Sequence, residues 1–157
     1  VLKNIYKELG VESSFNETTL SLKKLAEPQS KQLTLDLVNA PDIAQTIAVT
    51  CLGLKIGCNL KGLHTLKIKE TDRLVALQNE IKKLGTSIEI TDDSLHLKSP
   101  NKLNSNAHIA TYNDHRMAMA FAPLGLKTQL FIDDADVVSK SYPDFWSDLS
   151  ALGFELN

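Results

Sequence analysis

Residues 80–100 read EIKKLGTSIEITDDSLHLKSP, and this stretch describes one structural unit of the chain. Its first residues end an amphipathic helix, and Gly85 stops that helix, because a helix C-cap takes a left-handed backbone that costs glycine least. Apolar and polar residues then alternate on both sides of the polar turn Asp92-Asp93, which is typical of two paired strands. The stretch therefore predicts a helix, a glycine stop and a β-hairpin.

The same Leu-Gly stop occurs twice more along the chain. YKELG at residues 6–10 precedes a second alternating stretch at 11–24, so we expect a helix and a hairpin there too. DLSALG at residues 148–153 is followed by 154–157, which we expect to begin a strand. Self-similarity of this kind indicates a repeated supersecondary unit.

A second repeated element lies between these stops. Its first copy runs from PDIAQT at 41–46 through a helix to a strand at 58–60. Its second copy runs from NDHRMA at 113–118 through a helix that ends near Gly125 to a strand at 129–132. The repeat period is therefore about 72 residues.

The whole chain, residues 1–157, is expected to form one α/β domain of mixed α+β character with about two such units. Hydrophobic residues make up 43% and charged residues 23%, which is enough for a packed core and argues against disorder. The chain starts with Val1 rather than Met, and both ends fall inside a repeat. We therefore expect a partial domain of a longer protein.

Charge and hydropathy exclude two classes of partner. The formal net charge is −2, so the chain has no overall attraction for nucleic acid or for an anionic membrane surface. The longest apolar run, residues 117–126, is interrupted by Pro123 and Gly125 and is too short to span a bilayer. We expect no nucleic-acid partner, no membrane partner, and binding of anions only where Lys and Arg cluster locally.

The metal-ligating residue types do not form a metal motif. Cys51 and Cys58 belong to no CxxC pair, so we expect buried, inert thiols and a cytoplasmic location as the default. The four histidines lack metal-ligand spacing, which excludes a structural zinc site. The acidic run 133–136 lacks the glycine and the closing glutamate of a calcium loop. We therefore predict no metal site.

Two predicted helices begin with the wrong charge. The N-terminal end of a helix is electropositive and favours acidic residues. Lys69 and Arg73 in the run KETDR, and Arg116 in the run NDHR, oppose that polarity. Backbone N–H groups next to arginine form a ready site for a phosphate or carboxylate, so a bound anion would offset the repulsion.

An ordinary solvated helix start is the alternative interpretation. Arg73 could pair with Glu70 or Asp72, and Arg116 could pair with Asp114. The repetition of the pattern at two related helices favours the anion site.

Several of these runs together resemble a known family. LKIKETDRLVALQNEIKKLG at 66–85, ATYNDHRMAMAFAPLGL at 110–126 and VVSKSYPDFWSDL at 137–149 resemble the C-terminal part of 5-enolpyruvylshikimate-3-phosphate synthases. PDIAQTIAV at 41–49 resembles the segment before them. KETDR, NDHRMAM and KSYP at these separations are far more specific than one short motif.

The resemblance implies a fold and a reaction. It implies an inside-out α/β domain of repeated βαβαββ units, one of two domains that close over the substrates. The family transfers the carboxyvinyl group of phosphoenolpyruvate to the 5-hydroxyl of shikimate 3-phosphate and releases phosphate, on the route to chorismate and the aromatic amino acids. It uses neither a metal nor an organic cofactor.

The resemblance also implies substrate-binding roles. Arg73, Arg116 and Lys140 resemble ligands of phosphoenolpyruvate. Asp42 and Lys69 resemble residues that hold the hydroxyls of the shikimate ring, with Asp42 placed to accept the proton of the 5-hydroxyl.

Proton transfer is implied for two further positions. Glu70 resembles the acid/base at the methylene carbon of phosphoenolpyruvate, and Lys140 resembles a second proton donor near the leaving phosphate. Asp114 and His115 are expected to orient Arg116, with ligation by His115 left open. Thr65 stands where the family often has a substrate-binding Asn, so it receives no role.

The family's N-terminal domain is absent from this sequence. It supplies a Lys/Arg pair and a further Arg, so we expect the isolated chain to be inactive. Two alternatives remain: a non-catalytic module that binds a phosphorylated metabolite, and a relative of UDP-N-acetylglucosamine enolpyruvyl transferase. The pair of proton-transfer residues, Glu70 and Lys140, favours an enzyme over a binding module.

Overall fold

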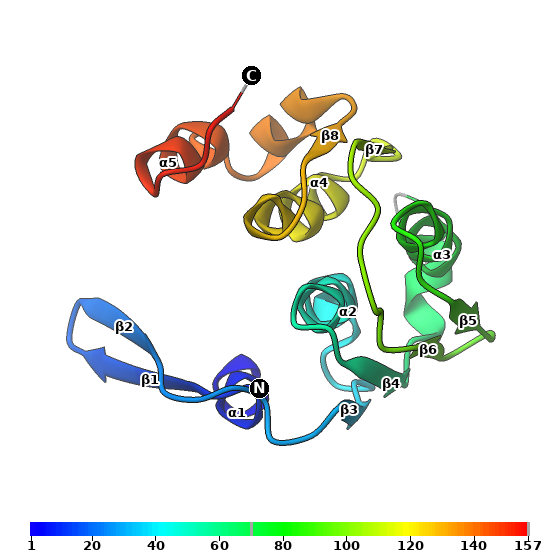
Figure 1. Ribbon diagram of the computed structural model, residues 1–157, viewed down its shortest axis with the longest axis horizontal. Helices are drawn as coiled ribbons and strands as arrows, with labels where there is room; N and C mark the ends of the chain where they lie inside the picture. Colours follow the sequence, from blue (N-terminus) through cyan, green and yellow to red (C-terminus); the bar gives the residue numbers. More distant parts are fainter. Residues whose placement is uncertain (70, 157) are drawn as a thin grey trace. The chain divides into compact units, whose positions relative to one another are not determined.

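Helices and strands alternate along the chain in the computed structural model, which describes residues 1–69 and 71–156 (Figure 1). The mixture of the two confirms the predicted α/β class. Two compact units form, Val1–Lys31 and Gln32–Asn157. The predicted acid/base Glu70 lies outside the described residues.

The first unit is a helix followed by a β-hairpin, as predicted from its sequence. Its elements are α1 (Leu2–Glu8), β1 (Val11–Asn16) and β2 (Thr19–Lys24). Gly10 ends the helix with φ +87°, and a Cβ at this position would lie 2.1 Å from the carbonyl oxygen of Ala26. Both the left-handed backbone and the close approach require glycine here.

A four-stranded sheet forms the base of the second unit. Its strands are β3 (Gln32–Asp36), β4 (Gly57–Lys61), β5 (Ile88–Ile90) and β6 (Leu95–Leu97), in the order β3-β4-β6-β5. β3 and β4 are parallel, whereas β6 pairs antiparallel with both β4 and β5. The predicted strand at 58–60 and the predicted hairpin within 86–100 are confirmed, while β3 was not predicted.

A second, two-stranded parallel sheet pairs β7 (Ala107–Ile109) with β8 (Leu130–Ile132). β8 confirms the predicted strand at 129–132. The strand predicted to begin at 154 is wrong for residues 154–156, which have no regular structure. Phe154 packs instead against an apolar cluster that includes Phe145 and Leu149, and a strand is stable only where a neighbouring strand pairs with it.

The helical segments of the second unit lie between these strands along the chain or after the last strand, β8. They are η1 (Pro41–Ile43), α2 (Ala44–Gly53), η2 (His64–Ile68), α3 (Arg73–Lys83), α4 (His115–Phe121), η3 (Ala122–Leu126), η4 (Ala135–Lys140) and α5 (Phe145–Ala151). The helix predicted to run to Gly125 changes to a 3₁₀ turn at Ala122. Pro123 explains the change, because its ring excludes a continuous α-helix.

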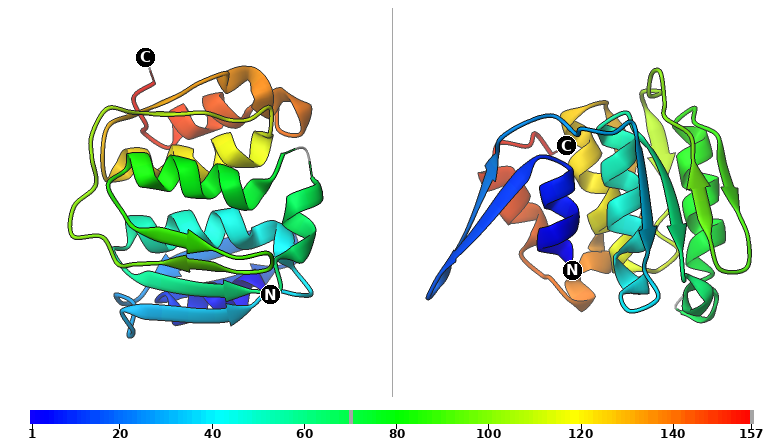
Figure 2. Two further views of the ribbon diagram at one scale, coloured as in Figure 1. Left: turned by 90° about the vertical axis from the view of Figure 1, so that its right-hand side faces the viewer. Right: turned by 90° about the horizontal axis from the view of Figure 1, so that it is seen from below.

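The core lies between the sheet and the helices. Figures 1 and 2 show α2 and α3 along one face of the four-stranded sheet, and α4 packs against α2. α2 is buried almost all round, which explains its apolar sequence from Ala44 to Leu52. Cys51 and Cys58 are buried and free of disulfides, as predicted. The pKa of the Cys58 thiol is raised, chiefly by a hydrogen bond with Cys51 and also by burial.

Within the described part of the chain, no helix combines the length and the apolar composition needed to cross a bilayer. The same residues contain no group of three or more His, Cys, Asp or Glu side chains that is arranged to hold a metal ion.

Candidate functional site

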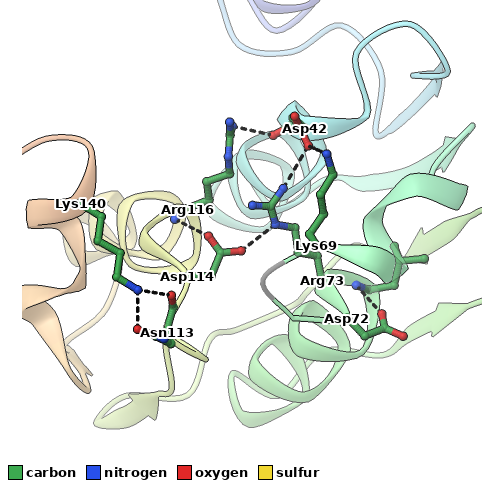
Figure 3. A network of polar contacts seen from close by, with 9 residues as sticks. Asp42, Lys69, Asp72, Arg73, Asn113, Asp114, Arg116 and Lys140 are labelled. Carbon is green, nitrogen blue, oxygen red and sulfur yellow. Dashed lines mark hydrogen bonds and ion pairs between the residues drawn. The ribbon is translucent and has the colours of Figure 1, made fainter.

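Charged side chains from several segments of the second unit meet at one place (Figure 3). They are Asp42 of η1, Lys69 after η2, Arg73 at the start of α3, Asp114 and Arg116 at the start of α4, and Lys140 at the end of η4. Arg73 and Arg116 are the only arginines in the sequence. Both therefore belong to this network, as expected from their places at two related helix starts.

Aspartate caps place the two arginines in the first turns of their helices. Asp72 Oδ1 accepts hydrogen bonds from the backbone N–H groups of Leu74 and Val75, each at 3.1 Å. Asp114 Oδ1 accepts one from the backbone N–H of Arg116 at 2.9 Å. These bonds satisfy N–H groups that have no partner within the helix, so the caps define where α3 and α4 begin.

Arg73 is buried between two carboxylates. Its side chain is 2% exposed, and its Nε donates to Asp114 Oδ2 at 2.6 Å while its Nη1 donates to Asp42 Oδ1 at 3.0 Å. Asp114 is fully buried as well. A buried ion pair of this kind is stable only because each charge has its partner in place.

These contacts change both interpretations of the helix starts. Asp72 caps α3. Arg73 pairs with the carboxylates of Asp114 and Asp42, which are distant in sequence. Carboxylates of the protein itself thus offset part of the positive charge for which the sequence suggested a bound anion. Arg116 donates from Nη1 to the backbone carbonyl of Asp42 at 3.3 Å.

Asp42 is the centre of the network. Besides Arg73, Lys69 Nζ lies 3.3 Å from its Oδ1, and the carboxylate keeps 42% of its surface exposed. Partial burial raises the pKa of Asp42, but the hydrogen bond and charge of Lys69 and the charges of Arg116 and Arg73 outweigh it and hold the pKa below its usual value. The carboxylate is therefore ionised at neutral pH and is a weak base while these cations contact it.

Lys140 reaches the network through Asn113. Its Nζ donates to the backbone carbonyl of Asn113 at 3.0 Å and to the side-chain Oδ1 at 2.5 Å. Asn113 directly precedes the capping residue Asp114, so the last residue of η4 is held at the start of α4. Asn113 was not singled out from the sequence, although it stands inside the quoted NDHR run.

A cavity of about 450 Å³ opens beside the network. Asp42, His115 and Arg116 form its charged and titratable wall, and Thr46 and Ser141 add hydroxyl groups. The remaining wall consists of Met119, Ala120 and Phe145. Arg116 is thus the cation of this wall and stands beside the carboxylate of Asp42. Charged groups, hydroxyl groups and an apolar side together suit a small polar molecule with a carbon skeleton.

The structure thus brings most of the residues singled out from the sequence together. Asp42, Lys69, Arg73, Asp114 and Arg116 share one network of ion pairs and hydrogen bonds. His115 lies in the cavity wall, and Lys140 joins through Asn113. Ser141 was missed, although it directly follows Lys140 in the quoted KSYP run.

Comparison with known proteins identifies the family. The family model described as EPSP synthase (3-phosphoshikimate 1-carboxyvinyltransferase) matches residues 1–149. A 3-phosphoshikimate 1-carboxyvinyltransferase of Bacteroides fragilis (strain YCH46) is 44% identical over 153 residues, which cover 96% of this chain and 37% of the relative. One from Escherichia coli O139:H28 is 39% identical over 121 residues, covering 76% of this chain and 28% of the relative.

A solved structure shows the same fold. The EPSP synthase of Acinetobacter baumannii aligns with a TM-score of 0.79 and 21% identity, over 96% of this chain and 38% of that chain. The chain thus spans a little over a third of the length of the Bacteroides fragilis and Acinetobacter baumannii proteins. Because the family model covers nearly the whole sequence, the chain belongs to the EPSP synthase family, as the runs KETDR and NDHRMAM indicate.

Proposed function

We propose that this chain is the C-terminal part of a transferase that moves the carboxyvinyl group of phosphoenolpyruvate to the 5-hydroxyl of shikimate 3-phosphate. The observation that carries the proposal is the convergence of Lys69, Arg73 and Arg116 on Asp42 beside a cavity of about 450 Å³. Family membership supplies the reaction, and the site supplies cationic groups for two anionic substrates.

The reaction is an addition followed by an elimination. The 5-hydroxyl of shikimate 3-phosphate gives its proton to a base, its oxygen bonds to carbon 2 of phosphoenolpyruvate, and a proton adds to carbon 3. The bond from carbon 2 to the phosphate oxygen then breaks, a proton leaves carbon 3 to restore the double bond, and phosphate is released. Cations around the phosphate and carboxylate stabilise the negative charge that these groups carry throughout.

Each residue receives a role within this scheme. Arg116 and Lys140 bind phosphoenolpyruvate from the two sides of the start of α4. Arg73 binds it too, and its contacts with Asp114 and Asp42 hold the guanidinium in position. Two planar guanidinium groups suit a ligand that carries both a carboxylate and a phosphate.

Asp42 and Lys69 hold the hydroxyl groups of the shikimate ring. The low pKa of Asp42 means that it accepts the 5-hydroxyl proton only if substrate binding loosens its contacts with Lys69 and Arg73. Glu70 adds and removes the proton at carbon 3, and Lys140 donates a proton near the leaving phosphate. Both roles rest on family membership.

The complete protein also requires the N-terminal domain of the same polypeptide, which closes the site. We propose a cytoplasmic enzyme that needs no cofactor and binds neither nucleic acid nor membranes. The isolated chain is expected to be inactive, because part of the anion site and the closure that excludes water are supplied elsewhere.

A chimera tests the proposal. The aligned part of this chain, 96% of its length, would replace the matching region of the Bacteroides fragilis relative, which is 44% identical there. Phosphate release from phosphoenolpyruvate and shikimate 3-phosphate would then be measured. We expect turnover by the chimera, none by the isolated chain, loss in the chimera that carries Arg116→Gln, and retention in one that carries the exposed control Lys98→Gln. A folded chimera without turnover would contradict the proposed function.

A further inference from the structure

Glu80 is a buried acid that the proposed reaction does not use. It lies in α3, two helical turns after Arg73, and is 1% exposed. Its Oε2 accepts hydrogen bonds from Lys83 Nζ at 2.6 Å and from the backbone N–H of Ala110 at 3.0 Å. Its Oε1 accepts one from the hydroxyl of Tyr112 at 2.7 Å. Burying a carboxylate is costly unless it is paired in this way, so this position needs an explanation.

Two of these donors belong to one short segment. Ala110 and Tyr112 lie just before Asn113 and the start of α4. Tyr112 and Asn113 both have a left-handed backbone, with φ of +54° and +58°. A bulky residue such as tyrosine adopts this conformation only where the surrounding structure holds it there. Glu80 thus forms hydrogen bonds with this segment on both sides of Thr111.

Two residues at the left-handed turn contact the charged network, Asn113 and Asp114. Asn113 places two oxygens on Lys140 Nζ, and Asp114, the next residue, accepts from Arg73 Nε. Arg73 and Glu80 stand on the same helix. α3 therefore makes two contacts here: Arg73 at its start contacts the N-cap residue of α4, and Glu80 farther along contacts the segment that leads into α4.

We propose that Glu80 is a positioning residue that holds the Tyr112-Asn113 turn and thereby sets the places of Asp114, Arg116 and Lys140 for the anionic substrate. The pKa of Tyr112 is raised, chiefly by burial and also by the hydrogen bond to Glu80, which agrees with a phenol that keeps its proton and donates a hydrogen bond to the carboxylate. The substrate in this inference rests on the proposed function, whereas the contacts of Glu80 do not.

The test compares the full chain with three variants. Glu80→Gln removes the charge but keeps the shape, Tyr112→Phe removes one donor and leaves Glu80 intact, and Glu89→Gln removes an exposed carboxylate of the same unit as a control. Hydrogen exchange of the amides at 110–114 reports the turn without any ligand. Because the chain has only two arginines, the Nε–H signal of Arg73 reports the contact with Asp114.

We expect Glu80→Gln to speed exchange of the Ala110 amide by about tenfold or more, the loss that follows removal of a hydrogen bond to a charged group. The Nε–H signal of Arg73 should shift in Glu80→Gln and in Tyr112→Phe, and stay unchanged in Glu89→Gln. A residue that merely stabilises α3 would leave that signal in place once global stability is matched. Unchanged exchange at 110–114 and an unchanged Arg73 signal would overturn the inference.

Titration with phosphoenolpyruvate provides the functional arm. We expect the apparent Kd to rise about tenfold in Glu80→Gln, because removing the charge loosens the turn that positions Arg116 and Lys140. The Kd of Glu89→Gln should stay at the wild-type value. If the wild-type chain does not bind phosphoenolpyruvate, the arginines need the domain supplied elsewhere, and the exchange measurements still decide the role of Glu80. The proposed function is contradicted by a folded chimera without turnover, so the two failures are distinguishable. If Glu80→Gln does not fold, Tyr112→Phe decides the role of Glu80.

Discussion

The contacts of Arg73 concern both stability and substrate binding. An arginine that is 2% exposed and lies between Asp114 and Asp42 holds two segments distant in sequence, η1 and the start of α4, at the start of α3. Asp114 has no exposed surface, so removal of this partner would leave a buried carboxylate without its cation. The same guanidinium is a proposed ligand of phosphoenolpyruvate, so the site is built around a group that the fold itself requires.

Replacing Arg73 is therefore expected to destabilise the protein strongly. Arg73→Met leaves the buried Asp114 carboxylate without its partner and should lower the free energy of unfolding by about 3 kcal/mol or more. The matched variant Arg116→Met loses one longer bond to a backbone carbonyl and should cost about 1 kcal/mol. Urea unfolding measures both. Equal losses in the two variants would contradict the structural role of Arg73.

The lowered pKa of Asp42 predicts how its stabilising effect depends on pH. A carboxyl group whose pKa is lower in the folded state than its unfolded value of about 3.9 stabilises the fold above that value, and the effect is lost as pH falls through the folded pKa. Asp42→Asn should therefore be less stable than the wild type at pH 7, and the difference should shrink below pH of about 4. Unfolding free energies measured across this range test it. A pH-independent difference would show that the ion pairs of Asp42 contribute nothing.

At the scale of the element, the starts of α3 and α5 differ in how they are capped. Asp72 accepts two backbone hydrogen bonds at the start of α3, whereas Asp144 occupies the N-cap position of α5 without a side-chain cap bond. Sequence alone suggests the same function for both aspartates, because each stands directly before a helix. Only the structure separates them.

Asp72→Ala should cost about 1 kcal/mol of unfolding free energy, the usual value for the loss of an N-cap. Asp144→Ala is the matched control and should lower the unfolding free energy by only about a few tenths of a kcal/mol. Thermal unfolding of the two variants under the same conditions provides the measurement. A larger cost at Asp144 than at Asp72 would contradict the capping assignment.

The sequence predicted elements with strong local signals and missed those that depend on neighbours. The helices that end at Gly10 and Gly85 were predicted from their glycine stops. The hairpins that follow them were predicted from alternating apolar and polar residues. β7 is only Ala107–Ile109 and is a strand because β8 pairs with it, which no local pattern records. The reverse happened at 154–156, where the position after the third Leu-Gly stop predicted a strand that does not form.

The candidate site was predictable in its membership but not in its contacts. Cations at two helix starts indicated Arg73 and Arg116 as partners in one site. The pairing of Arg73 with Asp114 and Asp42 could not be predicted, because it depends on how η1, α3 and α4 pack. Glu80 gave no signal in the sequence, since a glutamate on a helix is usually a solvated charge.

At the scale of the whole molecule, one apolar surface is exposed. The hairpin of the first unit places Phe15 opposite Leu20, and Leu22 lies on the same face because strand residues alternate between faces. These side chains are 76%, 51% and 66% exposed. A contiguous apolar face of this kind favours association between protein molecules.

We expect the chain to self-associate through this hairpin at high concentration. The double variant Phe15→Ser/Leu22→Ser should shift sedimentation equilibrium toward the monomer. Leu126→Ser, which removes a single leucine that is 71% exposed in the second unit, should leave the equilibrium unchanged. A wild-type chain that stays monomeric at high concentration would contradict the expectation.

The most direct test of the central claim is a titration of the isotope-labelled chain with phosphoenolpyruvate, and separately with inorganic phosphate, followed by NMR. The claim predicts shifts confined to the amides at 71–73 and 114–116, to Lys140 and to the two arginine Nε–H signals, at lower concentrations of phosphoenolpyruvate than of phosphate. A folded chain that shows no localised shifts at millimolar ligand would contradict it, because the arginines at the two helix starts would then not form an anion site by themselves.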